Sequence, residues 1–213
     1  MSDVPAKVEL SITSTSQVIT NPNQPAQVPK ITMNGNPFPT PKGLPGSASG
    51  FQVVVLNAAM DMTNPAAIIS NSYQWVQPQG TNWMSSYQYM YNNIVFQMLT
   101  SGNINQQLVF LASFGLDANM NPNTSALQWM IDTGAGPVVQ DWITHVDRGS
   151  EGGQWTQQPA NYILVGYSSQ SYGQGNELFQ KQWGGNPLST NLTVTLSNVV
   201  PPPEPAAKET AAA

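Results

Sequence analysis

The chain has 213 residues, of which 8% are charged, with a net charge of -5 and no cysteine. Its polar surface comes instead from 20 Asn and 20 Gln, and 40% hydrophobic residues suffice to bury the core of one domain. The missing cysteines exclude disulfides and thiolate chemistry, and six basic residues are too few to predict a nucleic-acid partner.

The two ends of the chain have their own compositions. The start, MSDVP, has neither a basic segment nor an apolar run, so no secretory signal is visible. No apolar run reaches the roughly 18 residues of a membrane-spanning helix, so we expect no membrane insertion. We expect a flexible N-terminus over residues 1–6, one domain over 7–200 and a disordered Pro/Ala-rich tail over 201–213. The protein is then cytoplasmic, or exported by a route that needs no signal peptide.

The first half of the chain predicts three strands and a helix. Residues 7–14 alternate apolar and polar side chains, as a strand with one wet face does. Residues 20–50 are dense in Pro, Gly and Asn, which favours loops and sheet edges. A strand buried on both faces is predicted at 51–56, and residues 67–76 supply the next predicted strand. Between 85 and 100 the apolar spacing becomes helical.

The central part predicts one buried strand and two helices. The run QLVFLASF at 107–114 is the strongest buried-strand candidate. After the turn DANMNPN, Asn123 or Thr124 can cap a helix that ends before Gly134. Helical spacing recurs over residues 138–146.

The last part predicts a strand at 161–167, a short helix around Leu178 and Phe179, and an alternating strand at 191–199. Strands therefore stand at both ends of the chain with helices between them. This order indicates an α+β fold, a two-sheet β-sandwich with three or four short helices inserted, in one domain.

Five segments, taken in order, carry a resemblance to a known family. They are GFQVVVLN at 50–57, QLVFLASFGLD at 107–117, NTSALQWMIDTGAG at 123–136, NYILVGYSSQ at 161–170 and NELFQKQ at 176–182. Their order resembles the interleukin-like EMT inducer domain, also called the pancreatic-derived factor domain. The family's disulfide cysteines are absent, and Gln158-Pro159-Ala160 stands where the family often has an Arg-Asp pair.

The resemblance implies a sandwich fold and a role that is not catalytic. In the stem of an O-mannose N-acetylglucosaminyltransferase such a domain looks like a carbohydrate-binding module, and in secreted relatives it is described as cytokine-like. Asp117 stands at the acidic position that follows the family's central strand, where the stem uses acidic side chains. The resemblance therefore implies Asp117 as a sugar contact.

Catalytic motifs are scarce. His145 is the single histidine and no GxSxG turn accompanies it, so we predict no catalytic residue and no enzyme. An acid pair for glycoside hydrolysis stays open, because sequence alone places no two carboxylates at the required separation.

The Asx-rich turn has two interpretations. Asp117, Asn119, Asn121 and Asn123 bear oxygens at every second position, as the start of a calcium loop does. Pro122 replaces the turn glycine of such a loop, and Gln128 stands where its closing Glu would be. We therefore favour a capped loop-to-helix turn and predict no cofactor, with calcium as the alternative.

Sugar recognition needs flat rings and planar hydrogen-bonding groups. Trp129 and Trp142 lie on helical stripes and are predicted to be core residues. Trp155, Tyr167 and Tyr172 have polar, glycine-rich neighbours and are the predicted stacking residues. With Asp117, Asn119 and Asn121 they form the predicted carbohydrate-binding set.

The sequence thus predicts a recognition module for a neutral glycan or glycoconjugate. The low charge suits a neutral ligand, because no strong field selects for an anionic one. Two alternatives remain: a structural or self-assembling surface or appendage protein, which would form homo-oligomers, and a cytokine-like protein-binding domain.

Overall fold

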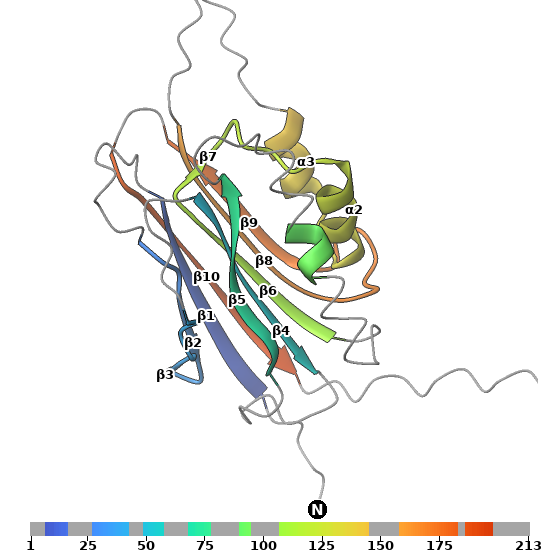
Figure 1. The fold of residues 1–213 in the computed structure, drawn as a ribbon. Coiled ribbons are helices and arrows are strands. Elements are labelled where there is room, and N and C mark those ends of the chain that lie inside the picture. Colours follow the sequence, from blue (N-terminus) through green and yellow to red (C-terminus); the bar gives the residue numbers. More distant parts are fainter. Residues whose placement is uncertain are drawn as a thin grey trace, which may run out of the picture.

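The structure is a computed structural model in which the described residues form a β-rich domain with few helices. They are residues 7–16, 27–42, 49–57, 68–77, 90–94, 107–144, 158–182 and 186–197. Figure 1 shows that the strands form a curled sheet and that helices α2 (Thr124–Asp132) and α3 (Pro137–Thr144) lie against one of its faces.

Five strands form the antiparallel centre of the sheet. Their spatial order is β5 (Ile68–Gln77), β4 (Ser49–Asn57), β6 (Gln107–Phe114), β8 (Pro159–Tyr167) and β9 (Asn176–Lys181). The two-residue strand β7 (Leu116–Asp117) pairs with the start of β8. β4, β6 and β8 carry the apolar runs of the sequence and are buried almost throughout, because both of their faces are covered.

The remaining four strands group around β1 (Lys7–Ser16). One edge of β1 pairs along its whole length with β10 (Leu188–Ser197), and the other pairs with β2 (Lys30–Met33), which continues into β3 (Asn36–Pro37). β1 meets β6 through one parallel residue pair, Thr15 with Phe114, and this pair joins the ten strands into one mixed sheet. The prediction of a β-rich fold is thus confirmed.

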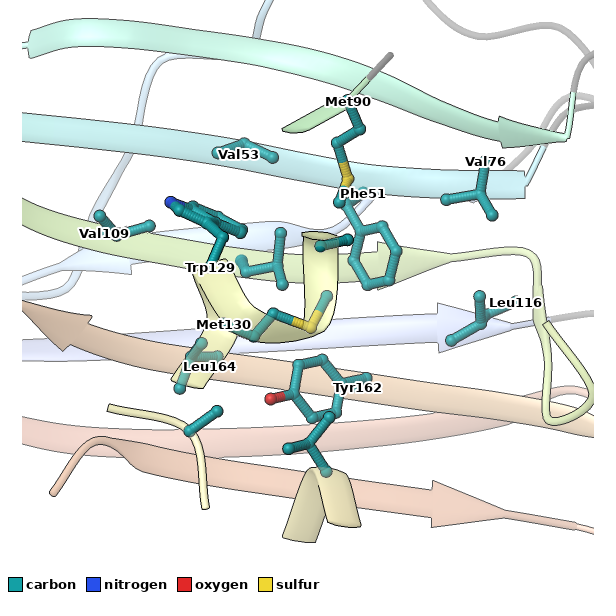
Figure 2. Close-up of a cluster of buried hydrophobic side chains, with 14 of the residues drawn as sticks. Phe51, Val53, Val76, Met90, Val109, Leu116, Trp129, Met130, Tyr162 and Leu164 are labelled. Atoms are coloured by element: carbon teal, nitrogen blue, oxygen red, sulfur yellow. The ribbon is translucent and has the colours of Figure 1, made fainter. Parts of the chain in front are cut away.

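The central strands separate two apolar cores because successive side chains point to opposite faces. Phe51 and Val53 of β4 point toward the helices, and Figure 2 shows them with Trp129 and Met130 of α2. Val54 of the same strand points to the other face, where it joins Leu10 and Ile12 of β1. Burying both faces of β4, β6 and β8 therefore needs the helices on one side and the β1 group on the other.

A buried polar cluster joins β1 and β10 to β8. Asn161 of β8 is fully buried; its Oδ1 accepts a hydrogen bond from Ser14 at 3.0 Å. Its Nδ2 donates to the carbonyl of Leu188 at 2.9 Å and to Thr190 Oγ1 at 3.1 Å. Ser113 Oγ of β6 lies 3.1 Å from Ser14 Oγ. A buried amide with all these partners fixes where the strands cross, because any other arrangement would leave it unsatisfied.

Most sequence predictions of strands and helices are confirmed in the described residues. The strands predicted at 7–14, 51–56, 67–76 and 107–114 correspond to β1, β4, β5 and β6. The other predicted elements that the structure confirms are α2 with Asn123 as its N-cap, α3, β8 over residues 161–167, and β10, which begins at Leu188 rather than at residue 191. Tryptophans 129 and 142 are buried, as predicted.

The predicted short helix around Leu178 and Phe179 is wrong. These residues form β9, paired with β8 so that Leu178 lies opposite Ile163. Six residues are too few for a helical period to be distinguished from a strand, and pairing along the open edge of β8 decides the outcome.

Several predictions concern residues outside the described ranges. Of the helix predicted over 85–100, the structure describes residues 90–94, which are helical, with Met90 and Ile94 buried. The flexible N-terminus, the Pro/Ala-rich tail and the end of the stretch 138–146 lie outside these ranges.

Candidate functional site

The Asp117 turn, residues 117–123, connects β7 to α2. The carboxylate of Asp117 accepts hydrogen bonds from groups of the protein itself. Asp117 Oδ1 accepts hydrogen bonds from the backbone N–H and from the Nδ2 of Asn119, both at 2.9 Å. The other oxygen, Oδ2, accepts from the backbone N–H of Gln158 at 3.0 Å. The carboxylate thus ties the turn to the start of β8, which is the structural role that a short Asx turn performs.

The rest of this turn also forms a cap. Asn123 Oδ1 accepts from the backbone N–H of Ala126 at 2.9 Å and so caps α2. Asn119 and Asn121 are half-buried. Among the described residues, no group of three or more His, Cys, Asp or Glu side chains is arranged to hold a metal ion. This geometry supports the capped loop-to-helix interpretation of the segment.

The second turn, Ser168–Gly175 (the Tyr172 turn), connects β8 to β9 and is held against the C-terminal end of α2. The backbone N–H of Gln170 donates to the carbonyl of Asp132 at 3.0 Å. Two glycines make similar bonds: Gly173 to Ala135 at 3.0 Å and Gly175 to Gly134 at 2.8 Å. The backbone of this turn is therefore fixed at three points.

Glycines allow this close approach. A Cβ atom on Gly166 would overlap the carbonyl oxygen of Thr133, and one on Gly136 would lie 2.5 Å from the Cα of Gly173. Gly134 and Gly173 also have positive φ angles, +97° and +73°, which other residues rarely adopt. Residues without side chains are thus required on both sides of the junction between α2 and the second turn.

Glu177 connects this junction to the sheet. Its Oε1 accepts from the Tyr162 hydroxyl at 2.6 Å, and its Oε2 accepts from the backbone N–H of Gly136 at 3.0 Å. Gly136 immediately precedes α3, so the carboxylate also lies at the positive end of the helix dipole. The sequence signal for this role of Glu177 is the Gly-Pro start of α3, and its Gly136 lies 41 residues away in the sequence.

The two predicted tyrosines near this turn differ in exposure. Tyr167, the last residue of β8, is half-buried against the core on the β1 side, and burial raises the pKa of its phenol above the ordinary value. Tyr172 is 51% exposed, and no other large hydrophobic side chain is exposed in the described ranges. Its flanking residues Ser171, Gly173 and Gln174 are exposed too.

The predicted binding set divides between two places. The Asp117 turn leads into the N-terminal end of α2, and the second turn packs on its C-terminal end, a helix of nine residues or about 13 Å. Figure 1 likewise places β7 and the β8–β9 connection at opposite ends of β8. Trp155 and His145 lie outside the described ranges. The structure therefore does not bring Asp117 together with Tyr167 or Tyr172.

Trp142 of α3 lies inside the molecule. Its Nε1 donates to the carbonyl of Ala118 at 2.9 Å, and its ring stacks on Phe179 with centroids 5.2 Å apart. The ring is 1% exposed, so it holds α3 to β9 and is closed to a ligand.

Comparisons with known proteins add no family. No protein-family model matches the chain, and no curated protein matches it. In the described residues, no helix is both long and apolar enough to cross a membrane.

Proposed function

We propose that this protein is a non-enzymatic recognition domain for neutral carbohydrate and that the second turn, with Tyr172 at its surface, is the contact. The observation that carries the proposal is an exposed aromatic ring on a backbone held at three points. A ring held in this way can lie against the C–H face of a pyranose with little loss of conformational entropy on binding.

The neighbours of Tyr172 suit the same ligand. Ser171 and Gln174 are exposed and carry a hydroxyl and an amide, which both donate and accept hydrogen bonds. The chain's low charge favours a neutral ligand over an ionic one. Because its carboxylate accepts two hydrogen bonds inside its own turn and a third from the backbone N–H of Gln158, Asp117 is left out of this contact.

The test is a binding titration with the full chain. Neutral oligosaccharides are titrated into isotope-labelled protein, and backbone amide shifts are followed by NMR. We expect shifts centred on residues 168–175, with dissociation constants of about 1 mM or below. Binding absent up to about 10 mM across the panel, or shifts centred elsewhere, would overturn the proposal.

Two variants separate the ring from its hydroxyl. Tyr172→Ala removes the stacking surface, so affinity should fall about tenfold, whereas Tyr172→Phe should stay within about threefold. Tyr167→Phe is the matched control, since this tyrosine is half-buried in the same region and its ring is retained. Equal affinity for Tyr172→Ala and wild type would exclude Tyr172 as the contact.

We also propose that the strands are arranged as two sheets and that the chain is a member of the interleukin-like EMT inducer family. The single residue pair between β1 and β6 supports two sheets, as does the apolar core between the β1 group and the central strands.

A further inference from the structure

The strand β10 has an unprotected edge. Because β1 residues 10–13 pair with both β2 and β10, those two strands must lie on opposite edges of β1. Among the described strands β10 pairs with β1 alone, so its other edge carries backbone groups with no described strand beside them. At the first residues of β10, Asn161 binds the carbonyl of Leu188 and Gln180 binds Thr190. From Asn191 onward, the described part of the chain provides this edge with no such partner.

Other edges of the sheet carry features that oppose pairing. β3 has two residues, one of them Pro37. β9 includes the charged Glu177 and Lys181. β5 has register shifts near both ends, and such bulges disturb a regular edge. β10 has none of these: its register with β1 is continuous over ten residues, and LSTNLTVTLS includes no charge and no proline.

We propose that a second copy of this chain pairs with the open edge of β10, antiparallel and around a two-fold axis at Thr193. The pairing joins β10 of one protomer to β10 of its partner and gives a symmetric dimer. It does not depend on carbohydrate binding, because β10 and the Tyr172 turn are separate surfaces.

Self-pairing fits the side chains of β10. With Thr193 at the axis, each outward residue faces an outward one: Thr193 faces its own copy and Asn191 faces Thr195, all exposed and uncharged. On the inner face, the half-buried Leu192 meets Val194, which extends the core on the β1 side. A strand bearing charges would place like charges close together in such a pair.

The test measures molar mass against concentration for the full chain, by analytical ultracentrifugation. We expect a reversible monomer–dimer equilibrium in the wild type. Thr193→Lys places two ammonium groups opposite each other at the axis and should weaken dimerisation at least about tenfold. Thr32→Lys, on β2 and on the same outward face, makes the same charge change away from the edge and should leave the dimer unchanged.

Mixing two oppositely charged variants distinguishes weakened dimerisation from a folding defect. Thr193→Lys and Thr193→Glu should each be monomeric, and an equimolar mixture should form a heterodimer, which misfolded chains would not do. A wild-type chain that stays monomeric to about 1 mM overturns the proposal. So does a dimer that Thr193→Lys and Thr32→Lys weaken equally, or growth beyond a dimer that Thr193→Lys leaves unchanged.

Discussion

The two turns at the ends of α2 differ in the part that the predicted sugar contact of each turn, Asp117 or Tyr172, plays in the fold. In the Asp117 turn the side chain makes the structure: its carboxylate accepts three hydrogen bonds and holds the chain to β8. In the Tyr172 turn, backbone hydrogen bonds, glycines and the Gln170 side chain make the structure: Gln170 Oε1 accepts from the backbone N–H of Tyr167, and its Nε2 donates to the carbonyl of Gln174. The Tyr172 ring is left exposed to solvent. The difference shows that an Asx-rich segment, although chemically suggestive, is already occupied by its own fold, whereas a glycine-rich turn can leave its ring accessible.

The largest effect is expected from Gly166→Ala. The new methyl group overlaps the carbonyl of Thr133, and backbone atoms on both sides must move. We expect the free energy of unfolding to fall by about 3 kcal/mol or more, measured by denaturant unfolding. Gly35→Ala is the control: the residue has φ +75° and open space around it, so the cost should be about 1–2 kcal/mol. Equal losses in the two variants would contradict the role of close packing at α2.

The next effect is expected in the Asp117 turn. Asp117→Ala leaves the backbone N–H groups of Asn119 and Gln158 without their acceptor, and should lower the free energy of unfolding by about 2–3 kcal/mol. Asp117→Asn keeps one acceptor oxygen and should lose about half as much. Thermal and denaturant unfolding measure both. If Asp117→Ala kept full stability, the carboxylate would be free for a ligand and the contrast between the turns would fail.

A smaller effect is expected at Glu177, whose carboxylate accepts a hydrogen bond from Gly136, the residue that packs against Gly173 of the Tyr172 turn. Glu177→Gln keeps the shape but replaces one acceptor by a donor and removes the charge at the helix start; the loss should be about 1 kcal/mol. Glu9→Gln, an exposed carboxylate on β1, should change stability by less than about 0.5 kcal/mol. Chemical denaturation of the two variants provides the comparison.

The smallest change is expected for Tyr172→Ala. Because the ring is half exposed and its turn is held by backbone bonds, the free energy of unfolding should stay within about 0.5 kcal/mol of wild type. Thermal unfolding of the variant and of the wild type checks this prediction. A loss above about 2 kcal/mol would mean that the ring supports the turn, and the two turns would then be alike.

Much of the sheet could be predicted because its central strands are long apolar runs. QLVFLASF and NYILVGY are buried on both faces, and a strand buried on both faces appears in the sequence as a nearly continuous apolar run. The sequence does not predict β9 as a strand, because NELFQK is short and half-exposed. These residues form a strand through their pairing with β8. The β2–β3 hairpin lies in the stretch 20–50, for which the sequence favoured loops and sheet edges without a hairpin; its Asn34 and Gly35 both have positive φ, as an Asn-Gly hairpin turn requires.

The candidate site could be predicted only in part. The glycine-rich neighbourhood of Tyr172 indicated an accessible ring, and the structure leaves this ring exposed. The separation of Asp117 from Tyr172 depends on which end of α2 each turn meets, and sequence spacing does not determine that. The roles of Gly166 and Asn161 arise from contacts with Thr133 and Ser14 across the fold, so no local pattern announces them.

The pairing of β1 with β10 has a consequence for synthesis. β1 is the first described strand and β10 the last, and Lys7 lies opposite Ser197. During synthesis β1 is made long before β10, the strand with which it pairs along its whole length, so this pairing joins the two most distant described strands of the sequence. The edge of β1 that β10 covers is therefore exposed in the nascent chain while the central strands are made.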